Sequence, residues 1–282
     1  MVYFLYTFFR RCSLVAKGFS LILVFLLLLQ LCACSLRTPE GSGAAMPVIP
    51  EVSIRDSALE KAPIETTPPP PEHCEFYLPQ YTAEQITEYF NEVVLAVEYS
   101  DGTGNPSLVQ KWLCPITYKI FGNPTQEDLA VLKALFVQLN QIPGFPGISP
   151  APEGTVENLS FSFWPPEAFR NSFSSVVNGE DAYGATQFWY YTATNDIYTA
   201  RIGYRTDIDQ NTRNSILIEE VINTLGITDT VMREDSIVYQ YSDDNTKLSD
   251  VDLVILKLLY DPAIQCGMNS DECAAVISQL YY

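Results

Sequence analysis

The chain has 282 residues, 47% of them hydrophobic and 18% charged, with 34 acidic residues against 16 basic ones and a formal net charge of −18. Because so acidic a chain repels polyanions, nucleic acid is excluded as an expected partner. The one histidine, His73, excludes a histidine-rich zinc site, and it could support a Ser–His or Cys–His mechanism only by folding back from its proline-rich surroundings.

A signal-peptide pattern opens the chain. Arg10 and Arg11 precede an apolar run over residues 21–29, which is typical of an n-region followed by an h-region. The run ends in Leu31-Cys32-Ala33-Cys34, which resembles the lipobox of bacterial lipoproteins. We therefore expect residues 1–33 to be removed and Cys34 to carry a diacylglyceryl group and an amide-linked acyl chain such as palmitate.

An uncleaved membrane anchor is the alternative, because residues 18–33 are apolar apart from Ser20 and Gln30. That stretch is shorter than the ~20 apolar residues that a span requires. Ala33 also provides the small residue that cleavage needs. In both cases the rest of the chain is expected outside the cytoplasm, held at the cell membrane, with the membrane as its partner through the lipid on Cys34.

The segment 34–73 is expected to be a tether, since it contains Gly41-Ser42-Gly43, the run Pro68–Pro71 and few large apolar residues. Residues 74–282 are rich in aromatic and aliphatic side chains and show no second linker, which predicts one globular domain. The expected division is therefore a signal peptide over 1–33, a tether over 34–73 and a domain over 74–282.

Hydrophobic periodicity and capping residues predict an α+β domain. Thr125 opens a capping box ahead of the second expected helix, Gly226 is expected to be the left-handed cap of the third, and Pro262 ends the fourth. Two aromatic runs, 161–164 and 188–191, are expected in the core, with stacking platforms for sugars or peptides as the alternative. The expected helices cover 82–97, 125–139, 214–225 and 249–260, and the expected strands cover 111–121, 159–164, 196–204 and 236–241.

Four cysteines remain once Cys34 carries lipid and the signal peptide has left, and an exported chain permits disulfides. Four cysteines allow three pairings, of which we favour Cys266 with Cys273 and Cys74 with Cys114. Free buried thiols are the alternative.

The expected helix over 214–225 has an apolar face and a polar face that carries Glu219, Glu220 and Asn223. Its order of strand, helix and glycine stop resembles that of zincin metallopeptidases. In register with H-E-x-x-H-x-x-G-x-x-H, the three histidine positions hold Glu219, Asn223 and, nearby, Asp229, while Glu220 and Gly226 keep their letters.

The chain also resembles a bacterial family of domains of unknown function, family 2927, in three places. Its members tend to have E-E-x-x-Q-x-L-G, where this chain has residues 219–226, and a later L-L-Y-D-P…G-M, which matches Leu258–Pro262 and Gly267-Met268. The stretch Trp112…Pro115 resembles the opening of that family. The resemblance implies a zincin-like fold: a mixed sheet, a central helix over 214–225 and a C-terminal helical part.

A catalytic zinc takes three protein ligands, usually histidines with a carboxylate. Because the chain has one histidine, no metal and no cofactor is expected here. Oxygen ligands from Glu219, Asn223 and Asp229 would suit a divalent cation such as Ca²⁺ or Mn²⁺. Two further alternatives for these residues are a solvated polar helix face and a binding cleft without metal. Glu220 keeps the position of the zincin general base but lacks a metal-bound water to activate.

The leading functional hypothesis is a lipoprotein whose degenerate zincin-like domain binds an unknown cell-envelope ligand or protein without catalysis. A metal-dependent hydrolase or peptidase that uses Glu220 is the first alternative. A structural component of the cell envelope is the second.

Overall fold

The computed structural model describes residues 74–95, 108–174 and 182–282. The expected signal peptide, the lipidation site Cys34, the tether and His73 lie outside these residues, so those predictions stay open. Among the described helices, none is both long enough and apolar enough to cross a membrane.

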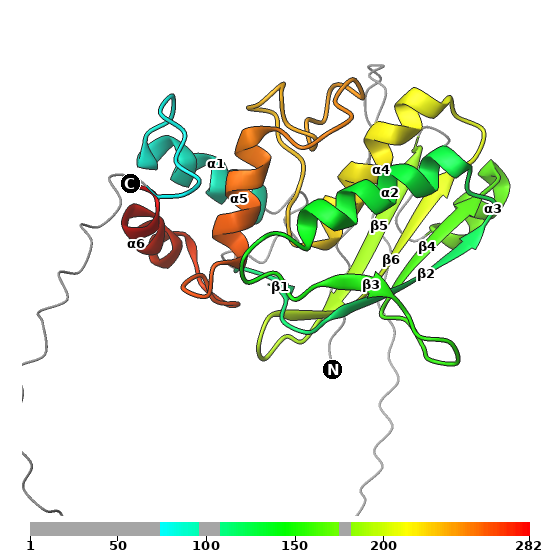
Figure 1. The fold of residues 1–282 in the computed structure, drawn as a ribbon, viewed down its shortest axis with the longest axis horizontal. Helices are drawn as coiled ribbons and strands as arrows, with labels where there is room; N and C mark the ends of the chain where they lie inside the picture. The colour runs from blue at the N-terminus through cyan, green and yellow to red at the C-terminus, as the bar shows by residue number, and fades with distance from the viewer. Residues whose placement is uncertain (1–73, 96–107, 175–181) are drawn as a thin grey trace, which may run out of the picture. The chain divides into compact units, whose positions relative to one another are not determined.

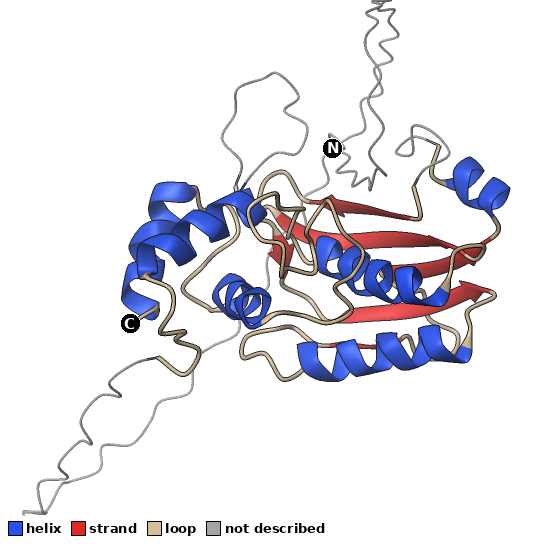
Figure 2. Ribbon diagram, turned by 90° about the horizontal axis from the view of Figure 1, so that it is seen from above, coloured by secondary structure: helices blue, strands red, loops and turns tan. Residues whose placement is uncertain are grey.

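A mixed, mostly parallel sheet organises the described part of the chain (Figures 1 and 2). The strands lie in the order β1-β6-β4-β2-β3 with parallel pairing throughout, and β5 pairs antiparallel with β6. The expected combination of a mixed sheet with helices is thereby confirmed. The strands are β1 (Lys111–Trp112), β2 (Ile116–Gly122), β3 (Ile148–Pro150), β4 (Leu159–Trp164), β5 (Gly184–Tyr190) and β6 (Asp196–Arg205).

Six described helices accompany the sheet: two lie along it, three gather beside it, and one packs on its opposite face. In Figure 1, α2 and α4 lie along the sheet, whereas α1, α5 and α6 gather beside it. The short helix α3 packs against the opposite face, because Phe173 beyond its end touches Gly203 while the next residue, Tyr204, reaches α4. The helices are α1 (Ala83–Leu95), α2 (Gln126–Leu139), α3 (Pro166–Ser172), α4 (Gln210–Thr224), α5 (Asp250–Tyr260) and α6 (Ser270–Leu280).

Helices α2 and α5 begin where the sequence predicts, and α2 does so at the expected capping box. Thr125 accepts a hydrogen bond from the Asp128 backbone N–H while the Asp128 carboxylate accepts one from Thr125, and Ser249 with Asp252 repeats this arrangement at α5. These expected starts are confirmed. They follow from bonds between residues three positions apart, which the sequence displays directly.

Two sequence predictions were wrong in part, and a third was wrong altogether. The expected strand over 111–121 is split into β1 and β2, because Pro115 has no N–H to donate. The stretch 236–241 is not a strand, because side chains accept the hydrogen bonds of its backbone N–H groups. The Asp252 carboxylate accepts from the Ile237 N–H, and Ser236 Oγ accepts from the Val238 N–H. Helix α4 begins four residues earlier than expected, because Asp209 caps it by accepting the Thr212 N–H.

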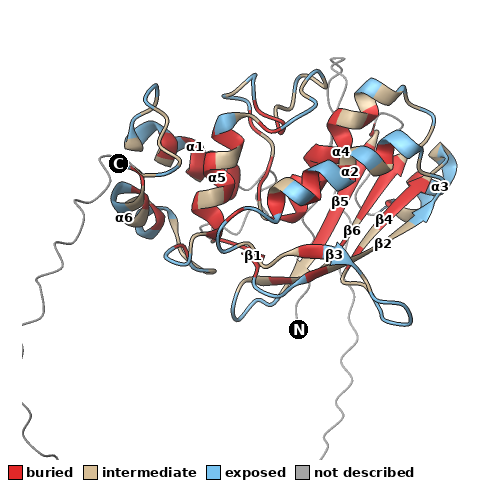
Figure 3. Ribbon diagram, in the orientation of Figure 1, coloured by how far each residue is buried: buried red, intermediate tan, exposed pale blue. Residues whose placement is uncertain are grey.

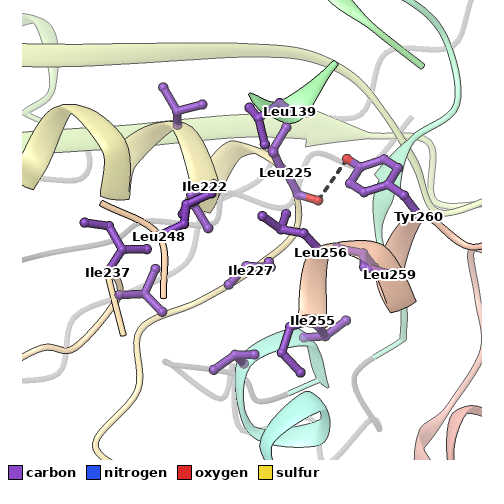
Figure 4. Close-up of a cluster of buried hydrophobic side chains, with 14 of the residues drawn as sticks. Leu139, Ile222, Leu225, Ile227, Ile237, Leu248, Ile255, Leu256, Leu259 and Tyr260 are labelled. Atoms are coloured by element: carbon purple, nitrogen blue, oxygen red, sulfur yellow. Dashed lines mark hydrogen bonds between the residues drawn. The ribbon is translucent and has the colours of Figure 1, made fainter. Parts of the chain in front are cut away.

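The core continues from the sheet into the helical group. Figure 4 shows apolar side chains from the end of α4, the segment after it and α5 packed together, with Tyr260 Oη donating to the Leu225 carbonyl at 3.2 Å. The chain leaves α4 through Gly226, whose φ of +96° and close approach to the Gln110 backbone leave no room for a Cβ. The glycine stop expected from the sequence is confirmed.

Candidate functional site

Helix α4 carries the residues that the sequence singles out, and neighbouring side chains hold its backbone from several directions. Carbonyls of α4 accept hydrogen bonds from Tyr204 Oη at Leu217 (3.1 Å), from Thr186 Oγ1 at Glu220 (2.9 Å) and from Trp112 Nε1 at Thr224 (2.8 Å). These donors belong to β6, β5 and β1. The helix is therefore fixed to the sheet along its length, and its side chains have defined positions.

The polar residues of α4 are buried. Glu219 is 2% exposed to solvent, Glu220 is 4% exposed and Asn223 is 0% exposed. Figure 3 shows most of α4 in the colour of buried residues. The interpretation of this face as a solvated helix surface is therefore wrong. Periodicity shows which residues share a face, but it does not show what covers that face.

Glu220 points toward the start of β5. A Cβ placed on Gly184 would come within 2.6 Å of Glu220 Oε1, so the glycine leaves room for the carboxylate. Burial raises the pKa of the neighbouring Tyr204 well above its ordinary value, and the negative charges of Glu220, Asp128 and Glu219 raise it further. The tyrosine is consequently a neutral neighbour of the two glutamates.

A polar row extends this site by one helical turn. Ser215, Glu219 and Asn223 are spaced four residues apart, so their side chains follow one line along α4, and all three are buried. Neither Ser215 Oγ nor either amide atom of Asn223 has a hydrogen-bond partner among the described residues. The sequence analysis missed Ser215, although its position one turn before Glu219 was the available signal. We call Ser215, Glu219 and Asn223 the α4 polar row.

Asp229, the third candidate ligand, follows α4 on a segment that is bonded to α1. The Thr228 N–H donates to the Val93 carbonyl at 2.6 Å, and Thr230 Oγ1 donates to Glu92 Oε1 at 2.8 Å. Across the described residues, no three side chains of histidine, cysteine, aspartate or glutamate are grouped so that they could hold a metal ion. The proposed oxygen-ligand set of Glu219, Asn223 and Asp229 gains no support from this arrangement.

All four described cysteines are free thiols, so neither favoured disulfide is present. Cys266 Sγ instead donates to the Lys111 carbonyl at 3.7 Å. Cys273 is buried on α6, a helix to which the sequence analysis gave no bounds within the expected C-terminal helical part. Cys74 is tied through its backbone N–H to Tyr282, while Cys114 is exposed. Burial raises the pKa of Cys273 to about 11, so this thiol stays protonated at neutral pH.

One comparison with known proteins agrees with the resemblance to family 2927 found in the sequence. A family model described as a protein of unknown function (DUF2927) matches residues 83–279, which include the sheet, α4 and most of α6. No curated protein is similar enough to this chain to count as a match.

Proposed function

The chain belongs to the DUF2927 family of proteins of unknown function, and from this premise we propose that it is a membrane-anchored, extracytoplasmic lipoprotein whose domain binds a cell-envelope ligand along α4 without catalysing a reaction. The anchoring part of the proposal is supported by the lipobox that ends at Cys34. The binding part is supported by the α4 polar row.

The observation that carries the binding proposal is Asn223, whose amide is fully buried and has no partner among the described residues. A buried amide without hydrogen bonds costs about 1–3 kcal/mol, so such groups are rare in folded proteins. Its side chain can donate two hydrogen bonds and accept two. A bound ligand that meets these groups offsets the cost and gives the residue a function.

The chemistry of the α4 polar row and of the adjacent Glu220 favours a ligand that carries a positively charged nitrogen. Glu219 and Glu220 bring two carboxylates to one part of α4, and charge-assisted hydrogen bonds from an amino or amidino group to a carboxylate are among the strongest available. Ser215 and Asn223 add a hydroxyl and an amide for the uncharged polar groups of the same ligand.

The same residues favour binding over catalysis. Glu220 stands where the zincin resemblance would place a general base, but a single histidine in the whole sequence leaves too few of the usual ligands for a catalytic zinc. We propose that the domain is a degenerate relative of zincins. The order of β6, α4, the stop at Gly226 and α5 supports this relationship.

Replacement of Asn223 by leucine tests the binding proposal. Because the substitution removes a buried amide without partners, Asn223→Leu should raise the free energy of unfolding by about 1 kcal/mol. It should also abolish retention of amine-bearing compounds when the full chain, immobilised in detergent, is exposed to the small-molecule fraction of a cell-envelope extract and its bound compounds are identified by mass spectrometry.

Asn214 on the same helix provides a matched control. It accepts from Gln210 Nε2 at 2.9 Å and donates to Glu127 Oε1 at 2.7 Å, so Asn214→Leu should lower the free energy of unfolding by about 1 kcal/mol and leave retention unchanged. The proposal fails if Asn223→Leu destabilises the chain as Asn214→Leu does and the two variants retain the same compounds as the parent.

A further inference from the structure

The sheet face opposite α4 carries a second arrangement that the proposed function does not use. Side chains alternate along β6, so Arg201 and Gly203 lie on the opposite face from Ile202 and Tyr204. The strand register places Lys119, Ser160, Arg201 and Gln187 in one row across β2, β4, β6 and β5. Arg201 is thus in the middle of this face, next to the position covered by α3.

Two aromatic rings and one amide hold the guanidinium group of Arg201 in place. Its central carbon lies 4.7 Å from the ring centroid of Phe173 and 6.0 Å from that of Trp189, and its Nε donates to Gln187 Oε1. Phe173 is itself fixed, because its ring lies so close to Gly203 that a Cβ there would overlap it. The cation is therefore pre-positioned by stacking, which lowers the entropy cost of binding a ligand.

Arg201 has no carboxylate partner within the described part of the chain. Arg205, Arg213 and Arg233 each pair with an aspartate at 2.8 Å, and Lys119 in the same row pairs with Glu157 at 3.1 Å. Partners are not scarce, since the chain has 34 acidic residues. Burial also lowers the pKa of Arg201, which is half-buried. No carboxylate of the described residues therefore balances this fixed, half-buried cation.

We propose that Arg201, with Trp189 and Phe173, forms a binding site for a carboxylate on this face of the sheet. Because Nε is bonded to Gln187, the two terminal Nη groups remain to form a parallel pair of hydrogen bonds with the two oxygens of a carboxylate. The partly exposed ring of Trp189 provides contact for a flat apolar group attached to that carboxylate, whereas Phe173 is buried and holds the guanidinium in place. This site is independent of the α4 polar row and does not rest on the proposed function.

Saturation-transfer NMR with benzoate as the probe tests this site on the full chain in detergent, since the benzoate ring protons lie clear of detergent resonances. Benzoate should bind saturably, and benzamide, which has the same shape without the charge, should not. Arg201→Gln should raise the Kd for benzoate about tenfold or more, and Arg201→Lys should also weaken binding because a lysine cannot form the parallel pair. Trp189→Leu should weaken binding while leaving the guanidinium present.

Arg170→Gln is the matched control, because it removes the same charge from α3 on this side of the sheet and should leave the benzoate Kd unchanged. Thermal melting of each variant verifies that the domain stays folded. Unchanged benzoate binding in folded Arg201→Gln would overturn the proposal. Binding of phenylphosphonate without binding of benzoate would overturn the assignment to a carboxylate, and equal binding of benzamide would overturn the role of the charge.

Discussion

Lys111 places an ammonium group inside the protein, where each of its three N–H groups needs an acceptor. Its Nζ donates to the carbonyls of Leu259, Asp261 and Ile264 at 2.7, 3.3 and 2.5 Å. These carbonyls lie at and beyond the C-terminal end of α5, where the helix dipole favours positive charge. Burial lowers the pKa of Lys111. One side chain thus holds the turn that leads from α5 toward α6.

Lys111→Met should lower the free energy of unfolding by about 3 kcal/mol, because three carbonyls lose a charged donor that water replaces poorly in the interior. Urea denaturation of the full chain in detergent, followed by circular dichroism, measures the change. Lys133→Met, at an exposed position on α2, should change stability by less than about 0.5 kcal/mol. Equal effects of the two substitutions would contradict the conclusion that Lys111 holds the turn after α5.

The elements α2 and α4 are joined by a buried ion pair between Asp128 and Arg213, 2.8 Å apart with side chains 1% and 6% exposed. Burial alone would raise the pKa of Asp128, but hydrogen bonds from Gln210, Thr125 and Arg213, with the arginine charge, outweigh burial and lower it. Asp252 occupies the same position in the capping box of α5, yet burial raises its pKa despite its hydrogen bonds. The carboxylates at equivalent positions of two helices therefore have pKa values shifted in opposite directions, so acidification changes their contributions to stability in opposite directions.

Acidification tests this contrast. Because the folded-state pKa of Asp128 is lowered, its stabilising contribution is complete above an unfolded-state pKa of about 4 and is lost as pH falls through the folded-state value. Asp128→Asn should lower the free energy of unfolding at pH 7 by about 3 kcal/mol and flatten its decline below pH ~4. Urea denaturation across this pH range provides the measurement.

Asp252→Asn is the comparison for the acid experiment. Its raised folded-state pKa makes protonation favour folding, a contribution that is present at low pH and is lost as pH rises from about 4 through the folded-state value. Removing this group should steepen the loss of stability on acidification. Identical pH profiles for the Asp128 and Asp252 variants would show that the two carboxylates do not differ as described.

In the described part of the molecule as a whole, a sheet layer and a helical group are joined at the end of α4. Trp112 and Tyr260 donate to the carbonyls of Thr224 and Leu225, and Gly226 passes against the Gln110 backbone. The first described residue, Cys74, is bonded through its N–H to the Tyr282 carbonyl at 2.6 Å. Cys74, which follows the proposed tether in the sequence, is therefore held beside Tyr282.

The substitution Cys34→Ser tests the proposed membrane anchor. If Cys34 carries the lipid, the variant should lose metabolic labelling with palmitate. It should also leave the membrane fraction, because it has no lipid to hold it there. Fractionation followed by immunoblotting measures both forms. Cys32→Ser is the control and should remain labelled and membrane-bound. Continued membrane association of Cys34→Ser would favour the uncleaved anchor.

The sequence by itself determined the local features of this protein. Thr125 and Ser249 mark the starts of α2 and α5 because their capping bonds join residues three positions apart, and Gly226 marks the end of α4 because the turn there has a positive φ. The sequence also showed that Glu219 and Asn223 share one face of a helix, since helical periodicity alone fixes that relation.

Only the tertiary structure decided what surrounds those residues. It buries Asn223 and leaves Cys266 bonded to Lys111 rather than to another cysteine. It also places Arg201 between two aromatic rings, with no carboxylate of the described residues paired to it. Each of these outcomes depends on contacts between residues far apart in the chain, whose packing no local pattern encodes. The sequence therefore identified the helix that carries the candidate site, while the surrounding contacts decided that this face is buried and that its amide lacks partners.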